Sequence, residues 1–251
     1  MTLVEYLRHP GVSSSDLRAF LKCPAKYATR GKKYRTPAML IGSAVHAAVE
    51  GIFGEVFAVL PDVDRRTKAG KDAYAAFSLE NVGREVITTE QLDAVNGMAT
   101  SILSLLNIRF GNAPITREPS LFWHDAETGL ACKARPDLII DGMEPAIIEV
   151  KTTTDASADA WYWKVKAMDY GIQAIHHREG CIENHTPNGW MVPYGWLVCE
   201  TDPPYASVIH WLRAGPRYQA DSERHRGALR RLKHCIDEMQ YPSYEEDECV
   251  W

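Results

Sequence analysis

Three charged residues have the types and spacing that hydrolytic chemistry needs: Asp137, Glu149 and Lys151. Two carboxylates about 5 Å apart repel each other unless a cation lies between them. Oxygen ligands of this kind suit Mg²⁺ or Mn²⁺. A lysine ammonium beside them could orient a water molecule or offset charge on a phosphate in the transition state. The three residues therefore predict metal-assisted phosphodiester cleavage, provided that the fold brings them together.

A β-hairpin would bring the two acids together. Residues 138–140 and 146–150 are apolar and β-prone, and the turn-rich residues 141–145 between them predict the hairpin. With these five residues as the loop, residue 140 pairs with residue 146 and Asp137 lies opposite Glu149. Side chains two residues apart share a face of a strand, so the lysine two positions after the glutamate points the same way.

The same register places Arg135 opposite Lys151, where it would contact the scissile phosphate or an acid. The alternative is a surface hairpin whose face carries only a salt bridge, because Glu-Val-Lys is common at strand ends. An aspartate followed by Glu-x-Lys on the next strand is the signature of the PD-(D/E)XK nucleases. Other segments of the chain are needed to choose between the two.

Length and composition favour one α/β domain over residues 1–251, with an acidic tail at about 241–251. The net charge of −5 argues against a protein that coats nucleic acid non-specifically. Local positive charge is nevertheless present in three clusters, at 22–35, 65–71 and 224–233, although each could be an ordinary solvated face. No apolar run reaches membrane-spanning length, no signal peptide is evident, and the six scattered cysteines indicate reduced thiols, so we expect a cytoplasmic protein.

Periodicity predicts a mixed sheet flanked by helices. Ser13 and Asp16 form a predicted helix start, and Pro24 interrupts that helix. The predicted helices cover 38–53, 89–106, 156–181 and 217–239. The predicted strands are 118–124, 130–140 and 146–152, followed by a hairpin of 190–199 and 206–212.

Several loose motifs, in the right order over about residues 11–180, resemble the RecE-type exodeoxyribonuclease VIII family of phage and prophage recombination nucleases. The family belongs to the PD-(D/E)XK superfamily, so the resemblance implies a restriction-endonuclease-like core. The matching stretches are Ser13–Leu17, Cys23–Tyr27, Ile41–His46, Arg65–Lys71, Glu118–Ser120, Thr128–Leu130, Arg135–Asp137, Glu149–Thr153 and the helix around Gln173.

The resemblance assigns roles to individual positions. His46 matches a helix-borne histidine that reaches the metal site, and Glu118 matches an acid that helps to hold the metal. Asp137 and Glu149 match the metal-bridging pair, and Lys151 matches the catalytic lysine. Without the resemblance, the histidine would be read as a polar residue at the edge of an apolar helix face.

Other residues are expected to contact DNA. Gln173 matches the glutamine of a Gln-x-x-x-Tyr helix motif near the scissile site, but His177 stands where the family has tyrosine. A 5′-terminal phosphate would need a cationic pocket, for which Arg30 is the first candidate and Lys32 and Lys33 are the next. These three could instead only attract the DNA backbone.

The resemblance implies an Mg²⁺-dependent exonuclease, with Mn²⁺ able to substitute and two ions expected. It would degrade linear double-stranded DNA from a 5′ end and leave 3′ single strands for an annealing protein. The family also implies a ring-shaped homo-oligomer. The alternatives are a structure- or sequence-specific endonuclease of the same fold and a DNA-binding module that does not cleave. A further alternative is a zinc site, because His177, Cys181 and His185 recur at four-residue steps, although no fourth ligand is evident.

Overall fold

A computed structural model of the chain describes residues 1–31, 35–185 and 192–244. Its centre is a five-stranded mixed sheet with the strand order β3-β6-β7-β8-β9. The bounds of these strands are Ile115–Arg117 for β3, Leu138–Ile140 for β6, Ala146–Thr153 for β7, Tyr194–Glu200 for β8 and Ser207–Trp211 for β9. Within this five-stranded sheet, β7 and β8 are parallel and the other neighbouring strands are antiparallel. The predicted α+β class with helices around a mixed sheet is confirmed.

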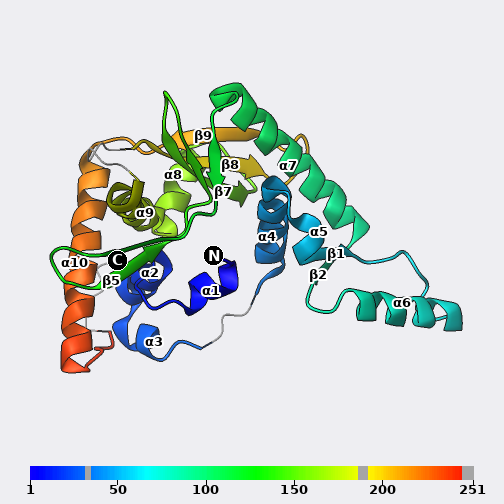
Figure 1. The fold of residues 1–251 in the computed structure, drawn as a ribbon, viewed down its shortest axis with the longest axis horizontal. Coiled ribbons are helices and arrows are strands. Elements are labelled where there is room, and N and C mark those ends of the chain that lie inside the picture. The colour runs from blue at the N-terminus through cyan, green and yellow to red at the C-terminus, as the bar shows by residue number, and fades with distance from the viewer. Residues whose placement is uncertain (32–34, 186–191, 245–251) are drawn as a thin grey trace, which may run out of the picture.

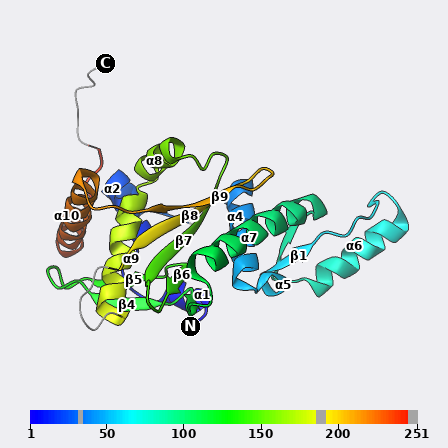
Figure 2. The same cartoon turned by 90° about the horizontal axis from the view of Figure 1, so that it is seen from above.

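Helices cover both faces of this sheet (Figures 1 and 2). On one face, α4 and α7 bury their apolar residues against Ile148 and Val150 of the central strand β7. On the other face, α2, α8, α9 and α10 form a second core that includes Ile147 of the same strand. The bounds of these helices are Ser14–Lys22 for α2, Pro37–Glu50 for α4, Thr89–Phe110 for α7, Ala158–Ala167 for α8, Tyr170–His185 for α9 and Pro216–Glu238 for α10. A strand buried on both faces holds its side chains rigidly, which suits a strand that positions reactive groups.

The predicted β6–β7 hairpin is confirmed in its register, because Ile140 pairs with Ala146. The capped start of α2 is confirmed as well. The hydroxyl of Ser13 accepts from the Asp16 amide, and the Asp16 carboxylate accepts from the Ser13 amide. The helix ends at Lys22, and Pro24 begins the short helix α3 (Pro24–Ala28). The hairpin around residues 202–204 is also confirmed, as β8 pairs antiparallel with β9.

Two predicted elements are wrong. The strand expected over 130–140 is two strands, because β5 (Ala131–Ala134) pairs with β4 (Leu121–His124) in a separate two-stranded sheet. Pro136 lies between β5 and β6 and cannot donate a ladder hydrogen bond, so the chain changes sheets there. The helix expected over 156–181 is also two helices, with a break at Asp169, whose φ of 51° is left-handed.

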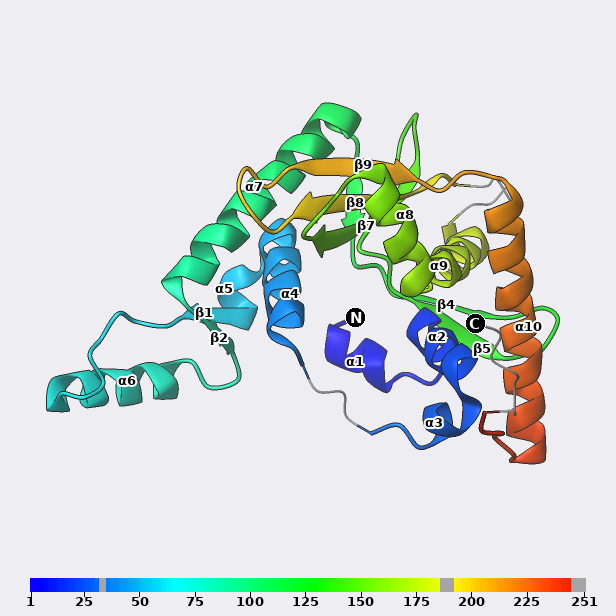
Figure 3. The ribbon, with the colours of Figure 1, turned by 180° about the vertical axis from the view of Figure 1, so that it is seen from behind.

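An arm that the periodicity missed occupies part of residues 54–88. The chain leaves the body through α5 (Phe53–Val56) and β1 (Phe57–Val59), and returns through β2 (Glu85–Ile87), which pairs parallel with β1. Between the two strands, α6 (Lys68–Glu80) projects away from the sheet and its helices in all three views (Figure 3). The short helix α1 (Leu3–Arg8) lies near the middle of the molecule, between α4 and α2.

The five cysteines in the described part of the chain are buried and form no disulfide. None of the helices that the structure describes is long and apolar enough to cross a bilayer.

Candidate metal-dependent active site

The two predicted acids meet at the start of the hairpin. The Asp137 carboxylate accepts from the Val150 amide at 2.7 Å, and the Asp137 amide donates to the Glu149 carboxylate at 3.3 Å. Burial, and next the negative charge of Glu149, raise the pKa of Asp137. A cation beside Asp137 would relieve both penalties, which is the behaviour expected of a metal ligand.

Lys151 lies beside the two acids, as the hairpin predicts. Its Nζ is 2.8 Å from the Glu149 carboxylate and 3.9 Å from that of Asp137. Burial alone would lower the pKa of Lys151, but the two carboxylates outweigh it and raise the pKa above its ordinary value. The lysine is therefore a fixed cation at neutral pH.

Glu149 has no free acceptor position. One oxygen accepts from His177 Nδ1 at 2.8 Å and from the Asp137 amide, and the other accepts from Lys151 and from the Gln173 amide at 2.9 Å. These four bonds use all the lone pairs of a carboxylate. Burial would raise the pKa of Glu149, but Lys151 and His177 hold it below its usual range. To ligate a metal as predicted, Glu149 must give up one donor, and Lys151 is the partially exposed one.

A second group of ligands adjoins this pair. His46 and Glu50 on α4, together with Glu118, offer ligand atoms within 4.8 Å of one another. The Nδ1 of His46 is also 3.6 Å from the Asp137 carboxylate, so the two groups are continuous. His46 and Glu118 are thus near Asp137, as the family resemblance implies.

Glu50 was missed by the sequence reasoning. Its four-residue spacing from His46 on a predicted helix was the signal that could have found it. Burial, then the charge and the hydrogen bond of Glu118, raise the pKa of Glu50 to about 8. A carboxyl group that is protonated beside a second carboxyl group commonly exchanges its proton for a metal ion, since either cation removes the repulsion.

Glu118 and Arg135 are held together at the rim of the site. Glu118 has a left-handed φ of 44°, an unfavourable conformation for a glutamate, and its amide donates to the Asp137 carbonyl. The Arg135 guanidinium donates to the Glu118 carboxylate at 2.8 Å and to the Ser120 hydroxyl at 2.6 Å. Of the two contacts expected for Arg135, the structure contains the one with an acid.

The helix α9 holds the Glu149 carboxylate in place through two side chains. Gln173 and His177 are one turn apart and both donate to Glu149, and Gln173 is only 9% exposed. His177, at the position where the RecE-type motif has tyrosine, therefore donates to this carboxylate, and it is not free for the zinc alternative. The contact of Gln173 with DNA stays a prediction.

The ligand groups open into a cleft of about 830 Å³. His46, Glu50, Glu118 and Arg135 line this cleft. Glu85, at the root of the arm, lines it as well. A cleft of this size that leads to buried carboxylates can admit a phosphate and its neighbouring groups.

The residues predicted to bind a terminal phosphate are less well placed. Arg30 forms an ion pair with Asp16 and lies over the Tyr27 ring at 4.5 Å, so much of its charge is offset. Lys32 and Lys33 lie outside the described residues, as does most of the acidic tail. The pocket for a 5′-phosphate stays a prediction.

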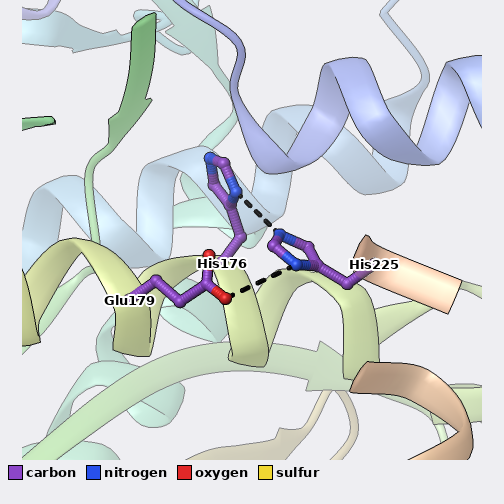
Figure 4. A group of neighbouring side chains, drawn as sticks. All are labelled: His176, Glu179 and His225. Carbon is purple, nitrogen blue, oxygen red and sulfur yellow. Dashed lines mark hydrogen bonds and ion pairs between the residues drawn. The ribbon is translucent and has the colours of Figure 1, made fainter. Parts of the chain in front are cut away.

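A second cluster of potential ligands lies in the interior, where His176, Glu179 and His225 approach one another (Figure 4). The Nε2 of His176 faces the carbonyls of Val12 and Lys133, so it carries the proton, and its Nδ1 accepts from His225 at 3.1 Å. Burial lowers the pKa of His225 to about 4. Because three of the four ring nitrogens form hydrogen bonds and the fourth, His225 Nδ1, lies 3.7 Å from Glu179, the cluster is best explained as a polar link between α9 and α10.

Comparisons with known proteins place this geometry in a family. The profile of the PDDEXK-like domain of unknown function (DUF3799) matches residues 13–250. Among solved structures, a candidate exonuclease from Eubacterium rectale is similar with a TM-score of 0.64 at 14% identity, over 97% of this chain and 89% of that one. A phage-related exonuclease from Haemophilus somnus 129PT covers 94% of this chain and 100% of its own at 12% identity, but its TM-score of 0.38 carries no argument. No curated protein matches the chain significantly. The first similarity supports the fold, and the predicted PD-(D/E)XK-like core is confirmed.

Proposed function

Because the chain belongs to the PDDEXK-like domain family DUF3799, we propose that it is a metal-dependent nuclease that hydrolyses phosphodiester bonds of DNA. The observation that carries this proposal is the placement of Lys151 between Asp137 and Glu149 on adjacent strands. A carboxylate pair with an adjoining fixed cation suits a reaction in which negative charge increases on a phosphate.

The donor set fits a divalent cation. Glu50 carries a proton that an ion could replace, and His46 lies near Glu50, Glu118 and Asp137. Three carboxylates and one imidazole favour Mg²⁺, with Mn²⁺ accepting the nitrogen more readily. A bound divalent ion would supply Lewis-acid stabilisation of the phosphate and a water of lowered pKa.

The residues themselves have distinct tasks. Asp137, Glu50, Glu118 and His46 would hold the ion, with Glu149 joining them once Lys151 leaves its carboxylate. The freed ammonium would then face the phosphate and orient the attacking water. Gln173 and His177 keep Glu149 in place during this exchange, because their bonds to it do not depend on the lysine.

At a finer level, we propose an exonuclease of the RecE type that acts on the ends of linear duplex DNA. The motif order along residues 11–180 supports this assignment. It would degrade one strand from its 5′ end, with two Mg²⁺ ions in the active site. The remaining 3′ single strand would pass to an annealing protein. A ring-shaped homo-oligomer is part of the same proposal.

The test is digestion of linear and circular duplex DNA, labelled at either end, with Mg²⁺ or with a chelator. Loss of the 5′ label from linear DNA alone supports the exonuclease. Nicking of the circle would instead identify an endonuclease. Binding without any metal-dependent cleavage would overturn the proposed activity.

A further inference from the structure

The three basic clusters of the sequence differ in how far they are neutralised. In the cluster on α10, acids pair with Arg224, Arg226, Arg230 and Lys233. In the first cluster, Arg30 and Arg35 pair with Asp16 and Glu85.

The cluster at 65–71 is less fully neutralised than the cluster on α10. Arg66 pairs with Asp64, and Arg65 lies over the Tyr74 ring at 4.7 Å. Within the described residues, neither Lys68 nor Lys71 forms an ion pair. All four cations are exposed, and no acid lies among them in the sequence. Four exposed cations, of which Lys68 and Lys71 form no ion pair with any described residue, are therefore grouped at one projecting point.

That point is the tip of the arm. Gly70 is the single buried residue of the helix α6, and the helix projects beyond the body in Figures 1–3. A helix of 13 residues is marginally stable in water without packing, so a partner that covers it would stabilise it. Leu79 and Val82, which are 77% and 78% exposed, lie at the other end of the helix or just beyond it.

The tip is nevertheless ordered locally. Arg66 bonds to Asp64 through its amide and its side chain, and the Thr67 hydroxyl joins the Asp64 carbonyl to the Gly70 amide. A Cβ atom at Gly70 would clash with the Asp64 backbone, so glycine permits this close turn. The cations are thereby presented as a group.

The root of the arm is joined to the active site. Phe57 and Ile87 on β1 and β2 are 1% exposed and belong to the core that includes α4. Glu85 on β2 lines the cleft of the candidate metal ligands. The arm therefore extends from the rim of the cleft, and the 13 residues of α6 extend over about 20 Å. That length corresponds to about six base pairs of duplex.

We propose that this arm is a second nucleic-acid contact, in which Arg65, Arg66, Lys68 and Lys71 bind the phosphate backbone of the same DNA whose scissile phosphate lies in the cleft. The inference rests on the proposed function, because the partner is the substrate of that site. Its contacts lie about six base pairs from the cleft, so they require a duplex longer than that.

The test compares a Lys68→Gln/Lys71→Gln variant with an Arg230→Gln/Lys233→Gln control. Both lose two positive charges, but the control loses them from the neutralised cluster. Binding to a duplex of about 5 base pairs, closed at one end by a neutral linker, and to a duplex of about 24 base pairs is followed by fluorescence anisotropy in chelator over a range of salt concentrations. Each phosphate contact contributes about 0.9 to the slope of log affinity against log salt concentration.

The arm variant should lower the slope for the long duplex by about 1.8. From 50 to 200 mM salt, wild-type affinity should then fall about 12-fold further than that of the arm variant. The short duplex and the control should show no such change. An unchanged slope, an equal effect on both lengths, or a change only in the oligomer size of the DNA-free protein would overturn the inference. If wild type cleaves DNA and the slope is unchanged, only the arm is wrong; if wild type neither binds nor cleaves DNA, the proposed function fails as well.

Discussion

Replacing Glu50 by glutamine should make the metal-free protein more stable and should weaken its response to divalent cations. Glu50 is half-buried beside Glu118, and these surroundings raise its pKa to about 8. At neutral pH the metal-free side chain is therefore mostly protonated. A glutamine amide has nearly the same shape as a protonated carboxyl group and can also donate to Glu118.

The size of the effect follows from proton linkage. An acid whose pKa is raised in the folded state contributes stability below its unfolded pKa of 4.5, and that stability is lost as the pH rises towards 8. Without solvent screening, a pKa raised from 4.5 to about 8 would lower the free energy of unfolding at pH 7 by about 3 kcal/mol relative to low pH. Because Glu50 is half-buried, solvent screening reduces this to about 1–2 kcal/mol. The glutamine variant should exceed wild type by that amount at pH 7 and match it near pH 5.

The assay is urea denaturation in chelator at the two pH values, repeated with Mg²⁺ and with Mn²⁺. Wild type should gain stability with the logarithm of the metal concentration, and the variant should gain less because it has lost a ligand. Glu55→Gln is the matched control, since Glu55 is an exposed glutamate that lines the same cleft. It should change neither the pH dependence nor the metal response.

Two results would refute the reasoning. A less stable Glu50→Gln protein in chelator at pH 7 would mean that Glu50 is ionised and well paired without metal. An unchanged metal response together with full activity would remove Glu50 from the site.

Further substitutions test the remaining assignments. Lys151→Ala should reduce cleavage by a factor on the order of 10²–10³, with circular dichroism showing an intact fold; near-wild-type digestion would contradict its role. Glu149→Gln should abolish cleavage and also lower the free energy of unfolding by about 3–5 kcal/mol, because it leaves the Lys151 ammonium without its buried partner; an unchanged urea midpoint would show that this network is not formed. His46→Ala should lower activity most at low metal concentration and be partly rescued by Mn²⁺, whereas a loss of thermal stability alone would make His46 a core residue. Arg30→Ala should erase any preference for 5′-phosphorylated over 5′-hydroxyl ends; a preference that survives, with weaker binding at high salt, would make Arg30 a backbone contact.

The local pattern of the hairpin was sufficient to predict its register. Apolar residues alternate with Glu149 and Lys151 around a turn-rich loop, and a one-residue slip would bury the charged face and expose the apolar one. The pairing of Ile140 with Ala146 confirms that reasoning. Strand 130–140 was wrong for a related reason, because Pro136 ends one ladder and periodicity does not reveal which sheet the next residues join.

The hydrogen-bond partners and the burial of each site residue could not be predicted from the sequence pattern. Nothing local in the sequence shows that Gln173 and His177 both donate to Glu149, since α9 and β7 meet only through tertiary packing. The saturation of that carboxylate, and the raised pKa of Glu50, are also consequences of tertiary packing. Desolvation depends on every neighbouring element, whereas spacing describes only one.

The sequence by itself determined the strand pair that carries Asp137, Glu149 and Lys151, because a two-residue alternation and a turn are local properties. Only the tertiary structure decided that Glu50 completes the ligand group, that acids neutralise most of the basic cluster on α10, and that the arm presents another cluster. Ion pairs and exposure depend on which segments meet in space. In the sequence alone, residues 65–71 and 224–233 are both rich in arginine and lysine, and nothing local distinguishes them.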